Sequence, residues 1–224
     1  GKFYAKMNNN PFKIYVKNEK PKKGAEILYV QGENDNKVLL NTNSFPYVSI
    51  SLNSENSLLL SGGHHYIKEA GFGKISKILN FDMEKFQDNF LKKISYEGIY
   101  NWNNKKCYKI RIEYEDYQPI NYYAKKGETL YEICENKLIN IAKIKELNPA
   151  LDISKKLTDN QEIIITNHYF KILVLYIDLE NYFPIYQLVY DENGLYEKYI
   201  YTKLVINKLI KNEEFNRDYK DYNF

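Results

Sequence analysis

Residues 121–149, NYYAKKGETLYEICENKLINIAKIKELNP, differ in pattern from the rest of the chain, which is rich in Tyr and alternates in polarity like β-strands. They contain the end of a strand, a glycine turn and two short stretches with helical periodicity. The apolar run in 161–166, QEIIIT, predicts a strand that closes the unit. The sequence therefore predicts a strand–helix–helix–strand module in the middle of a β-rich chain.

Four residues mark the ends of the two predicted helices. Thr129 and Glu132 have the spacing of a capping box, in which each side chain accepts from the other residue's backbone N–H. Asn140 is suited to cap a second helix, since apolar residues recur at helical spacing after it. Pro149 ends this helix, because the residue before Pro avoids helical geometry.

The module lies between two predicted strands of one sheet. The segment 106–116 alternates apolar and charged residues, as expected of a strand with one buried face, and 169–177 is a second strand. With 119–167 removed, these two strands are consecutive. We therefore expect 119–167 to be an autonomous insertion in a discontinuous scaffold formed by 1–118 and 168–224.

The scaffold has the pattern of an antiparallel sheet with helices on one face, which makes the fold class α+β. Residues 2–60 alternate in polarity between turn signals and predict a β-meander. Helical spacing over 64–92 predicts an amphipathic stretch, with Asp82 capping its second part. Two strands joined by a short turn follow at 185–207. The charged, aromatic tail 213–224 is expected to be poorly ordered or to lie along the surface.

Composition excludes several classes of function. The 224 residues are 44% hydrophobic, and the 23 Tyr fit half-buried strands better than a dedicated sugar-stacking surface. The net charge is only +3, and Arg111 and Arg217 are the only arginines, so nucleic-acid binding is not expected. Cys107 and Cys134 lie outside any metal-binding spacing, and no stretch is long and apolar enough to span a membrane. We expect no metal and no cofactor.

The module resembles a LysM domain, and the resemblance covers Tyr122 to Thr166. There are small departures: Glu128 stands where the family usually has Asp, Cys134 where Ala is common, and Asn160 where Gly is usual. The residues that carry the resemblance are Gly127, Glu128, Thr129, Leu130, Ile133, Ile144, Leu147, Asn148, Leu157, Gln161, Ile163 and Ile165.

This resemblance implies binding of N-acetylglucosamine-containing polymers, which in bacteria means peptidoglycan. In LysM domains the sugar lies in a shallow groove between the loop after the first strand and the loop after the second helix. Backbone groups at helix ends can bind its acetamido group there. Some of these residues also have structural roles, Thr129 as a cap and Leu130 in the core. The implied glycan-binding residues are Gly127, Glu128, Thr129, Leu130 and Tyr131, facing Asn148, Pro149, Ala150, Leu151 and Ile153.

The scaffold is similar to a family of bacterial envelope proteins. The segments that carry the similarity are 11–17, 23–41, 64–73 and 175–207. It implies a fold like that of the lipoprotein carriers LolA and LolB, a curved antiparallel half-barrel with helices against its concave face. It also implies a periplasmic or outer-membrane-associated location after removal of a signal peptide, and a lipid, lipoprotein or other envelope protein as a further partner.

The main alternative is a cell-wall-acting hydrolase that uses His65, Glu69 and His168. His65 and Glu69 have the spacing of metal ligands on a helix, but no pattern pairs His168 with them. These histidines can equally open a helix and fix its docking on the sheet. No phosphate loop, serine elbow or paired-carboxylate motif is present. We therefore expect a non-enzymatic protein that binds peptidoglycan, or one whose module has lost its ligand and serves structure or interaction.

Overall fold

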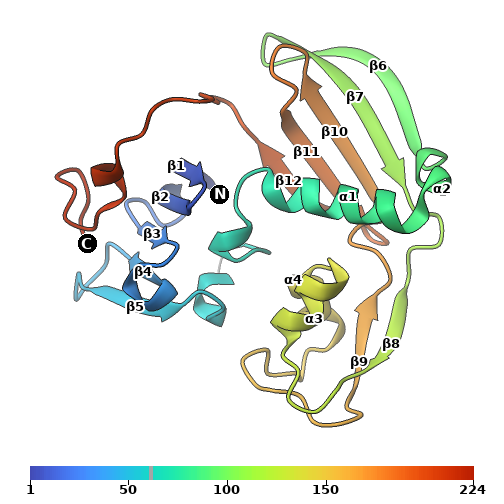
Figure 1. Cartoon of the computed structure of the whole chain (residues 1–224), viewed down its shortest axis with the longest axis horizontal. Helices are drawn as coiled ribbons and strands as arrows, with labels where there is room; N and C mark the ends of the chain where they lie inside the picture. The colour runs from blue at the N-terminus through green and yellow to red at the C-terminus, as the bar shows by residue number, and fades with distance from the viewer. Residues whose placement is uncertain (61–62) are drawn as a thin grey trace. The chain divides into compact units, whose positions relative to one another are not determined.

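The computed structural model describes residues 1–60 and 63–224. The fold belongs to the α+β class, with open antiparallel sheets and few helices, as the sequence predicted (Figure 1). The chain forms two compact units. The first comprises residues 1–69 and 207–224, and the second comprises residues 70–206.

The first unit contains a five-stranded sheet whose strands pair in chain order, which confirms the β-meander predicted for 2–60. Three consecutive residues of its second strand, Ile14 to Val16, are buried, so both faces of the sheet are covered. The strands are β1 (Lys2–Asn9), β2 (Phe12–Lys20), β3 (Glu26–Val30), β4 (Lys37–Asn41) and β5 (Ser49–Asn53). Short 3₁₀ helices are η1 (Asn34–Asn36), η2 (Ser57–Leu60) and η3 (Ile67–Glu69).

The C-terminal segment covers one face of the first sheet. Phe215, at the end of the 3₁₀ helix η4 (Asn212–Phe215), is buried in one cluster with Tyr15. The Tyr222 ring stacks on Tyr15, with 3.7 Å between the ring centroids. Asn223 donates from its backbone and its side chain to the buried Glu26 carboxylate, at 2.9 and 3.0 Å. The tail is therefore ordered against the sheet and completes the core of this unit.

The second unit contains a five-stranded antiparallel sheet in the order β12-β11-β10-β7-β6. Its strands are β6 (Ile94–Trp102), β7 (Lys105–Glu113), β10 (Ile172–Asp178), β11 (Pro184–Asp191) and β12 (Gly194–Ile200). The helix α1 (Gly73–Phe86) and the short helix α2 (Asp88–Leu91) precede it.

Helix α1 packs on one face of the second sheet. Its buried residues Ile75 and Ile78 form one hydrophobic cluster with Ile112, Leu173 and Val189 of the strands. The predicted cap Asp82 lies inside α1 and is buried, where it accepts a hydrogen bond of 2.6 Å from the Tyr114 hydroxyl, so that prediction was wrong. Among the described residues, no helix is both long and apolar enough to cross a bilayer.

The expected scaffold differs from the observed one in the number of sheets. The strands of 1–118 and 168–224 form two five-stranded sheets, and no strand pairing joins these sheets in the described part of the chain. Strands of both sheets alternate in polarity in the same way. That periodicity reports burial of one face but not which strands pair, so the division could not be predicted from it.

The second sheet is strongly curved where β6 turns into β7. Trp102 on β6 stacks on Tyr186 on β11, with 5.3 Å between ring centroids, although β7 and β10 lie between them. Three strand spacings in a flat sheet would be roughly 14 Å. At the same end, Asn103 donates to the Thr202 carbonyl just beyond β12, at 3.1 Å. The face with Trp102 and Tyr186 is therefore concave at this end.

Helix α1 packs on the opposite face of that sheet. Tyr186 pairs across the strands with Tyr176, whereas Leu175, the neighbour of Tyr176, belongs to the cluster beneath α1. Successive side chains of a strand point to opposite faces. The carrier resemblance placed helices on the concave face, and at this end of the sheet the structure has α1 on the convex one.

The residues between β7 and β10 form the predicted strand–helix–helix–strand module. Its elements are β8 (Pro119–Tyr123), α3 (Leu130–Lys137), α4 (Ile141–Leu147) and β9 (Glu162–Thr166), and β8 pairs antiparallel with β9. Since β7 and β10 are hydrogen-bonded neighbours, the module is inserted between adjacent strands of one sheet, as the sequence predicted.

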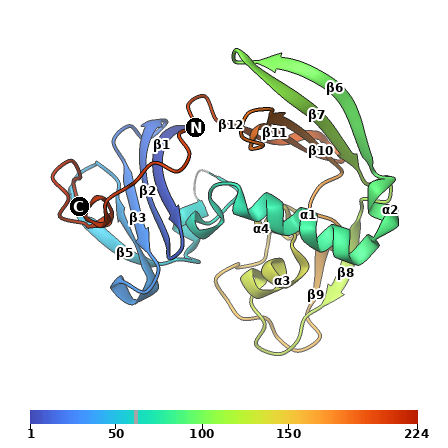
Figure 2. The same ribbon diagram turned by 45° about the horizontal axis from the view of Figure 1, so that its top comes forward.

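The module shares its core with the sheet. In Figures 1 and 2, α1 lies between the second sheet and the helices α3 and α4. Leu138, which ends α3, belongs to the same hydrophobic cluster as Ile75 and Ile78 of α1. The sequence suggested an autonomous insert, whereas the structure has one compact unit that contains both the module and the sheet.

Candidate functional site

Both helices of the module begin with the caps that the sequence predicted. Thr129 accepts from the Glu132 backbone, and the Glu132 carboxylate accepts from the Thr129 backbone N–H at 2.8 Å. These hydrogen bonds hold the pKa of Glu132 below its usual value. Asn140 accepts from the backbone of Ala142 and Lys143 at the start of α4. Local hydrogen bonds therefore fix where each helix starts, and with it the shape of the loops next to the candidate groove.

The loop after β8 and the loop before β9 are joined by backbone hydrogen bonds. Gly127 donates to the Leu157 carbonyl at 3.0 Å, and Leu157 donates to the Glu128 carbonyl at 2.8 Å. Gly127 has a φ of 84°, in the left-handed region that a side chain disfavours. The two loops that carry the predicted groove residues are thus part of one connected surface.

Glu128 is held in place by the first loop itself. The Tyr122 hydroxyl donates to its carboxylate at 2.9 and 3.1 Å, and the Lys125 backbone N–H donates at 2.9 Å. Burial raises the pKa of Tyr122, and the hydrogen bond to Glu128 raises it further. This carboxylate therefore shapes the loop, and a ligand would have to compete with two existing donors for it.

Asn148 fastens the end of α4 to the edge of β9. Its side-chain amide donates to the carbonyls of Ile144 and Ile164, at 2.8 and 2.7 Å. Its side-chain oxygen accepts from the Ile164 backbone N–H at 2.9 Å. These bonds satisfy both polar groups of Ile164 at the strand edge, so the Asn148 side chain has a structural role in the second half of the groove.

The ten predicted glycan-binding residues differ in their exposure. Leu130 is 0% exposed, so its side chain belongs to the core of the module and cannot contact a ligand. Pro149 and Ala150 are exposed. The remaining seven are half-buried: Gly127, Glu128, Thr129, Tyr131, Asn148, Leu151 and Ile153. Surface available to a ligand is therefore concentrated on the loop after α4.

Helix α4 is docked on the β11–β12 hairpin through a buried ion cluster. The Lys143 ammonium donates to Asp191 and Glu192 at 2.7 and 2.8 Å, and only 5% of its side chain is exposed. Burial lowers the pKa of Lys143, but the hydrogen bonds to both carboxylates outweigh this and raise it overall. Asn140 donates to the buried Glu197 carboxylate at 2.6 Å. Sequence reasoning missed this cluster, whose partners are about fifty positions apart.

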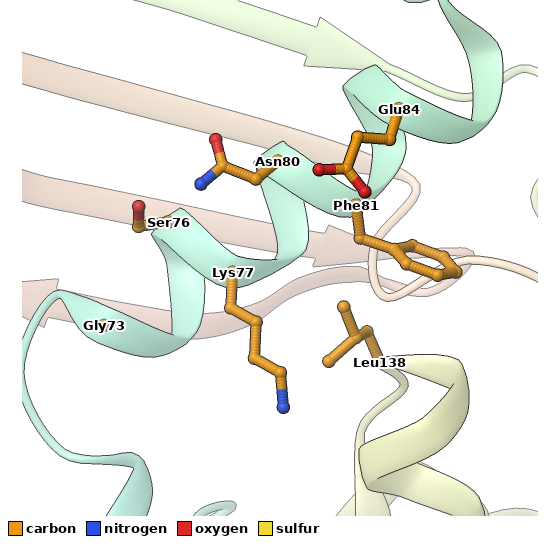
Figure 3. A pocket seen from close by; sticks show the side chains of 7 residues that line it. All are labelled: Gly73, Ser76, Lys77, Asn80, Phe81, Glu84 and Leu138. Carbon is orange, nitrogen blue, oxygen red and sulfur yellow. The ribbon is translucent and has the colours of Figure 1, made fainter.

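A different groove, of about 470 Å³, lies where the module meets α1 (Figure 3). None of the ten predicted glycan-binding residues lines it. Phe81 and Leu138 are its apolar residues, and Figure 3 shows them pointing toward each other from α1 and from the end of α3. Beside the groove, Lys74 and Lys77 of α1 bind Glu135 of α3 at 2.8 and 2.9 Å. The other lining residues are Gly73, Ser76, Lys77, Asn80 and Glu84.

The residues of the alternative catalytic site belong to different units. His65 and Glu69 lie in the first unit, with 3.5 Å between Nδ1 of His65 and Oε2 of Glu69. His168 lies in the second unit, where it stacks on Tyr114 and binds Asp116 at 3.2 Å. Burial lowers the pKa of His168, although Asp116 opposes this. In the described part of the chain, no group of three or more His, Cys, Asp or Glu could hold a metal ion.

The protein is thus of the α+β class and carries a helical module inserted between two strands of its second five-stranded sheet. The chain belongs to the family described as "Protein of unknown function (DUF1571)", whose model matches residues 2–145. The match covers the first sheet and continues through α1 and β7 into α4. No curated protein and no solved structure matches the chain.

Proposed function

We propose that this chain is a non-enzymatic protein of the bacterial cell envelope, and that its module binds peptidoglycan. The ligand class is glycan that contains N-acetylglucosamine, and the location is periplasmic or outer-membrane-associated. Support comes from the LysM resemblance of residues 122–166 and from the surface of the two loops that carry the groove residues.

The observation that carries the proposal is that the polar and the apolar side chains of the predicted glycan groove have different roles. The polar side chains of Glu128, Thr129 and Asn148 already have partners within the module. The predicted groove residues Pro149, Ala150, Leu151 and Ile153 of the second loop are apolar and accessible, and the exposed Asp152 between them accepts from Ser154. Such a surface suits the methyl group of an N-acetyl sugar, and backbone groups in irregular loops can bind its amide.

The resemblance to LolA and LolB also suggests a lipid or an envelope protein as a partner, and this part of the proposal concerns the second sheet and α1. A lipid or an envelope protein bound to this sheet has less support than the glycan, because α1 already covers the apolar face that such a ligand would use. The concave end carries the aromatic pair Trp102 and Tyr186 together with charged residues, among them Lys109, which is bonded to Glu97 at 2.6 Å.

The glycan proposal is tested with the purified full chain and insoluble peptidoglycan. We expect weak co-sedimentation, because one shallow groove buries little area and tight wall binding usually requires several copies. Titration with a chitin tetramer gives the affinity directly. Ile153→Ser removes apolar contact, which we expect to weaken binding about fivefold or more. Ala150→Asp places a charge on the same loop and should have a larger effect.

The control is Leu195→Ser, which removes an exposed apolar side chain from β12. It should leave both co-sedimentation and tetramer binding unchanged. Equal binding by the wild-type chain, Ile153→Ser and Ala150→Asp would refute the groove as the glycan site. Release of muropeptides by the wild-type chain would instead support the hydrolase alternative with His65, Glu69 and His168.

A further inference from the structure

One end of the first sheet presents apolar side chains that no described residue of its own unit covers. The loop between β4 and β5, residues 42–48, exposes Phe45 by 88%, Tyr47 by 68% and Val48 by 54%. Ile50, the second residue of β5, is also 38% exposed. A single exposed apolar residue is ordinary, but a loop tip with three large apolar residues within four positions indicates an interaction surface.

Three lysines lie at the same end of the sheet. In an antiparallel meander, the β2–β3 and β4–β5 connections come at the same end. Asn43 of the second loop donates to the Lys23 carbonyl of the first at 3.1 Å, which shows that the two loops touch. The first loop has the sequence KPKKG, and its Lys20, Lys22 and Lys23 are all exposed.

The two loops themselves contain no carboxylate. Residues 20–24 and 41–50 contain no Asp or Glu. Of the nearest acidic residues in sequence, Glu19 is paired with Lys2, and Glu26 is 0% exposed and bound to Lys17. The two loops therefore combine three exposed lysines with an apolar tip.

We propose that this end of the first sheet binds the surface of an anionic lipid membrane. The membrane-binding surface consists of Lys20, Lys22, Lys23, Phe45, Tyr47 and Val48. Aromatic side chains at a loop tip can enter the region between headgroups and acyl chains, where a tyrosine hydroxyl stays hydrated. Lysines beside them are attracted to anionic headgroups while their alkyl stems lie along apolar surface. This proposal does not depend on the glycan proposal, whose residues lie in the other unit.

The first experiment is vesicle flotation with the full chain. Vesicles of phosphatidylglycerol and phosphatidylcholine should bind it, pure phosphatidylcholine should bind it much less, and salt should weaken the interaction. The double variant Lys22→Gln, Lys23→Gln should bind about 25-fold more weakly, at about fivefold per lysine. Phe45→Ser with Tyr47→Ser should lose about tenfold or more.

The matched controls lie in the second unit. Lys145→Gln with Lys203→Gln removes the same net charge from exposed positions, and Tyr182→Ser removes an aromatic side chain that is 70% exposed. Both should float like the wild-type chain. The module variant Ile153→Ser should also float normally, so failure of one proposal is distinguishable from failure of the other.

The second experiment places a reporter in the loop. Trp102 is the only tryptophan, so Trp102→Phe with Tyr47→Trp yields a chain whose single tryptophan lies on the proposed surface. Anionic vesicles should shift its emission to the blue, and brominated lipids should quench it. The proposal is overturned if the emission does not change, or if the lysine and aromatic variants float like the wild type. Self-association that Phe45→Ser abolishes, without vesicle binding, would assign the surface to a second copy of the chain.

Discussion

Replacement of Lys143 by Met tests whether the buried ion cluster holds the module on the second sheet. Methionine keeps most of the apolar stem but removes the ammonium group. The Asp191 carboxylate, whose side chain is 7% exposed, then loses its cation. Breaking a buried ion pair by removing one partner costs about 3–5 kcal/mol.

The surroundings of the pair place the expected cost at the lower end of that range. The Asn193 backbone N–H donates to the other oxygen of Asp191 at 2.8 Å, and this bond remains in the variant. Glu192 is 34% exposed and can turn toward water, so loss of its ion pair with Lys143 adds little to the cost. We therefore expect Lys143→Met to destabilise the second unit by about 3 kcal/mol.

Urea unfolding followed by tryptophan fluorescence measures the loss of stability of the second unit. Trp102 is the only tryptophan, and it lies on β6 of the second sheet. With a slope of about 2 kcal/mol per molar urea, the midpoint should fall by about 1.5 M. Lys145→Met, an exposed position on the same helix, is the control and should shift the midpoint little.

Combining Lys143→Met with Asp191→Asn separates the ion pair from general damage to α4. The double variant no longer buries an unpaired carboxylate, so it should recover part of the stability, and the two single changes should not be additive. A midpoint for Lys143→Met within about 0.3 M of wild type, which is about 0.6 kcal/mol at this slope, would refute the reasoning.

Three further predictions concern the module and its connections. Thr129→Ala should cost about 1 kcal/mol by loss of the α3 cap, measured by the same unfolding assay, with Thr202→Ala unchanged as control. Because burial lowers the pKa of His168, the unfolded chain binds its proton more readily, and stability should fall as pH drops below the ordinary value of 6.5. His168→Phe should remove this part of the pH dependence of the urea midpoint; an unchanged pH profile would contradict it. Replacing 119–167 with a short turn should destabilise the second sheet, because Leu138 and the ion cluster are lost; an unchanged Trp102 transition would show an independent insert.

Local features of the module could be predicted from the sequence because their partners are close in the chain. The capping box of Thr129 and Glu132 spans three residues, and the Asn140 cap binds backbone groups two and three positions later. Polarity alternation likewise located β7 and β10 and, with them, the insertion point. Each of these depends on backbone geometry that a short segment adopts by itself.

Features that depend on distant partners could not be predicted. Lys143 follows Asn140 on a short helix and has the pattern of a surface lysine, yet its carboxylates come from a turn 48 and 49 residues later. Asp82 has the pattern of a cap but is buried, with a hydrogen bond from Tyr114, the residue directly after β7. The curvature that brings Trp102 onto Tyr186 arises from the twist of a whole sheet, which no single strand pattern encodes.

The two proposed contacts, one with glycan and one with lipid, would reinforce each other because they lie on different units of one chain. The chain passes between the units twice, at residues 69–70 and 206–207, so binding by one unit keeps the other at a high local concentration. Each contact alone is expected to be weak. On anionic vesicles that carry peptidoglycan fragments linked to their lipids, the wild-type chain should therefore be retained far better than on either surface alone, measured as the fraction bound after dilution. Ile153→Ser or Lys22→Gln with Lys23→Gln should each reduce retention to that of a single surface. Retention on these combined vesicles equal to the sum of the separate values would show that the geometry prevents both contacts at once, whatever the affinity of each.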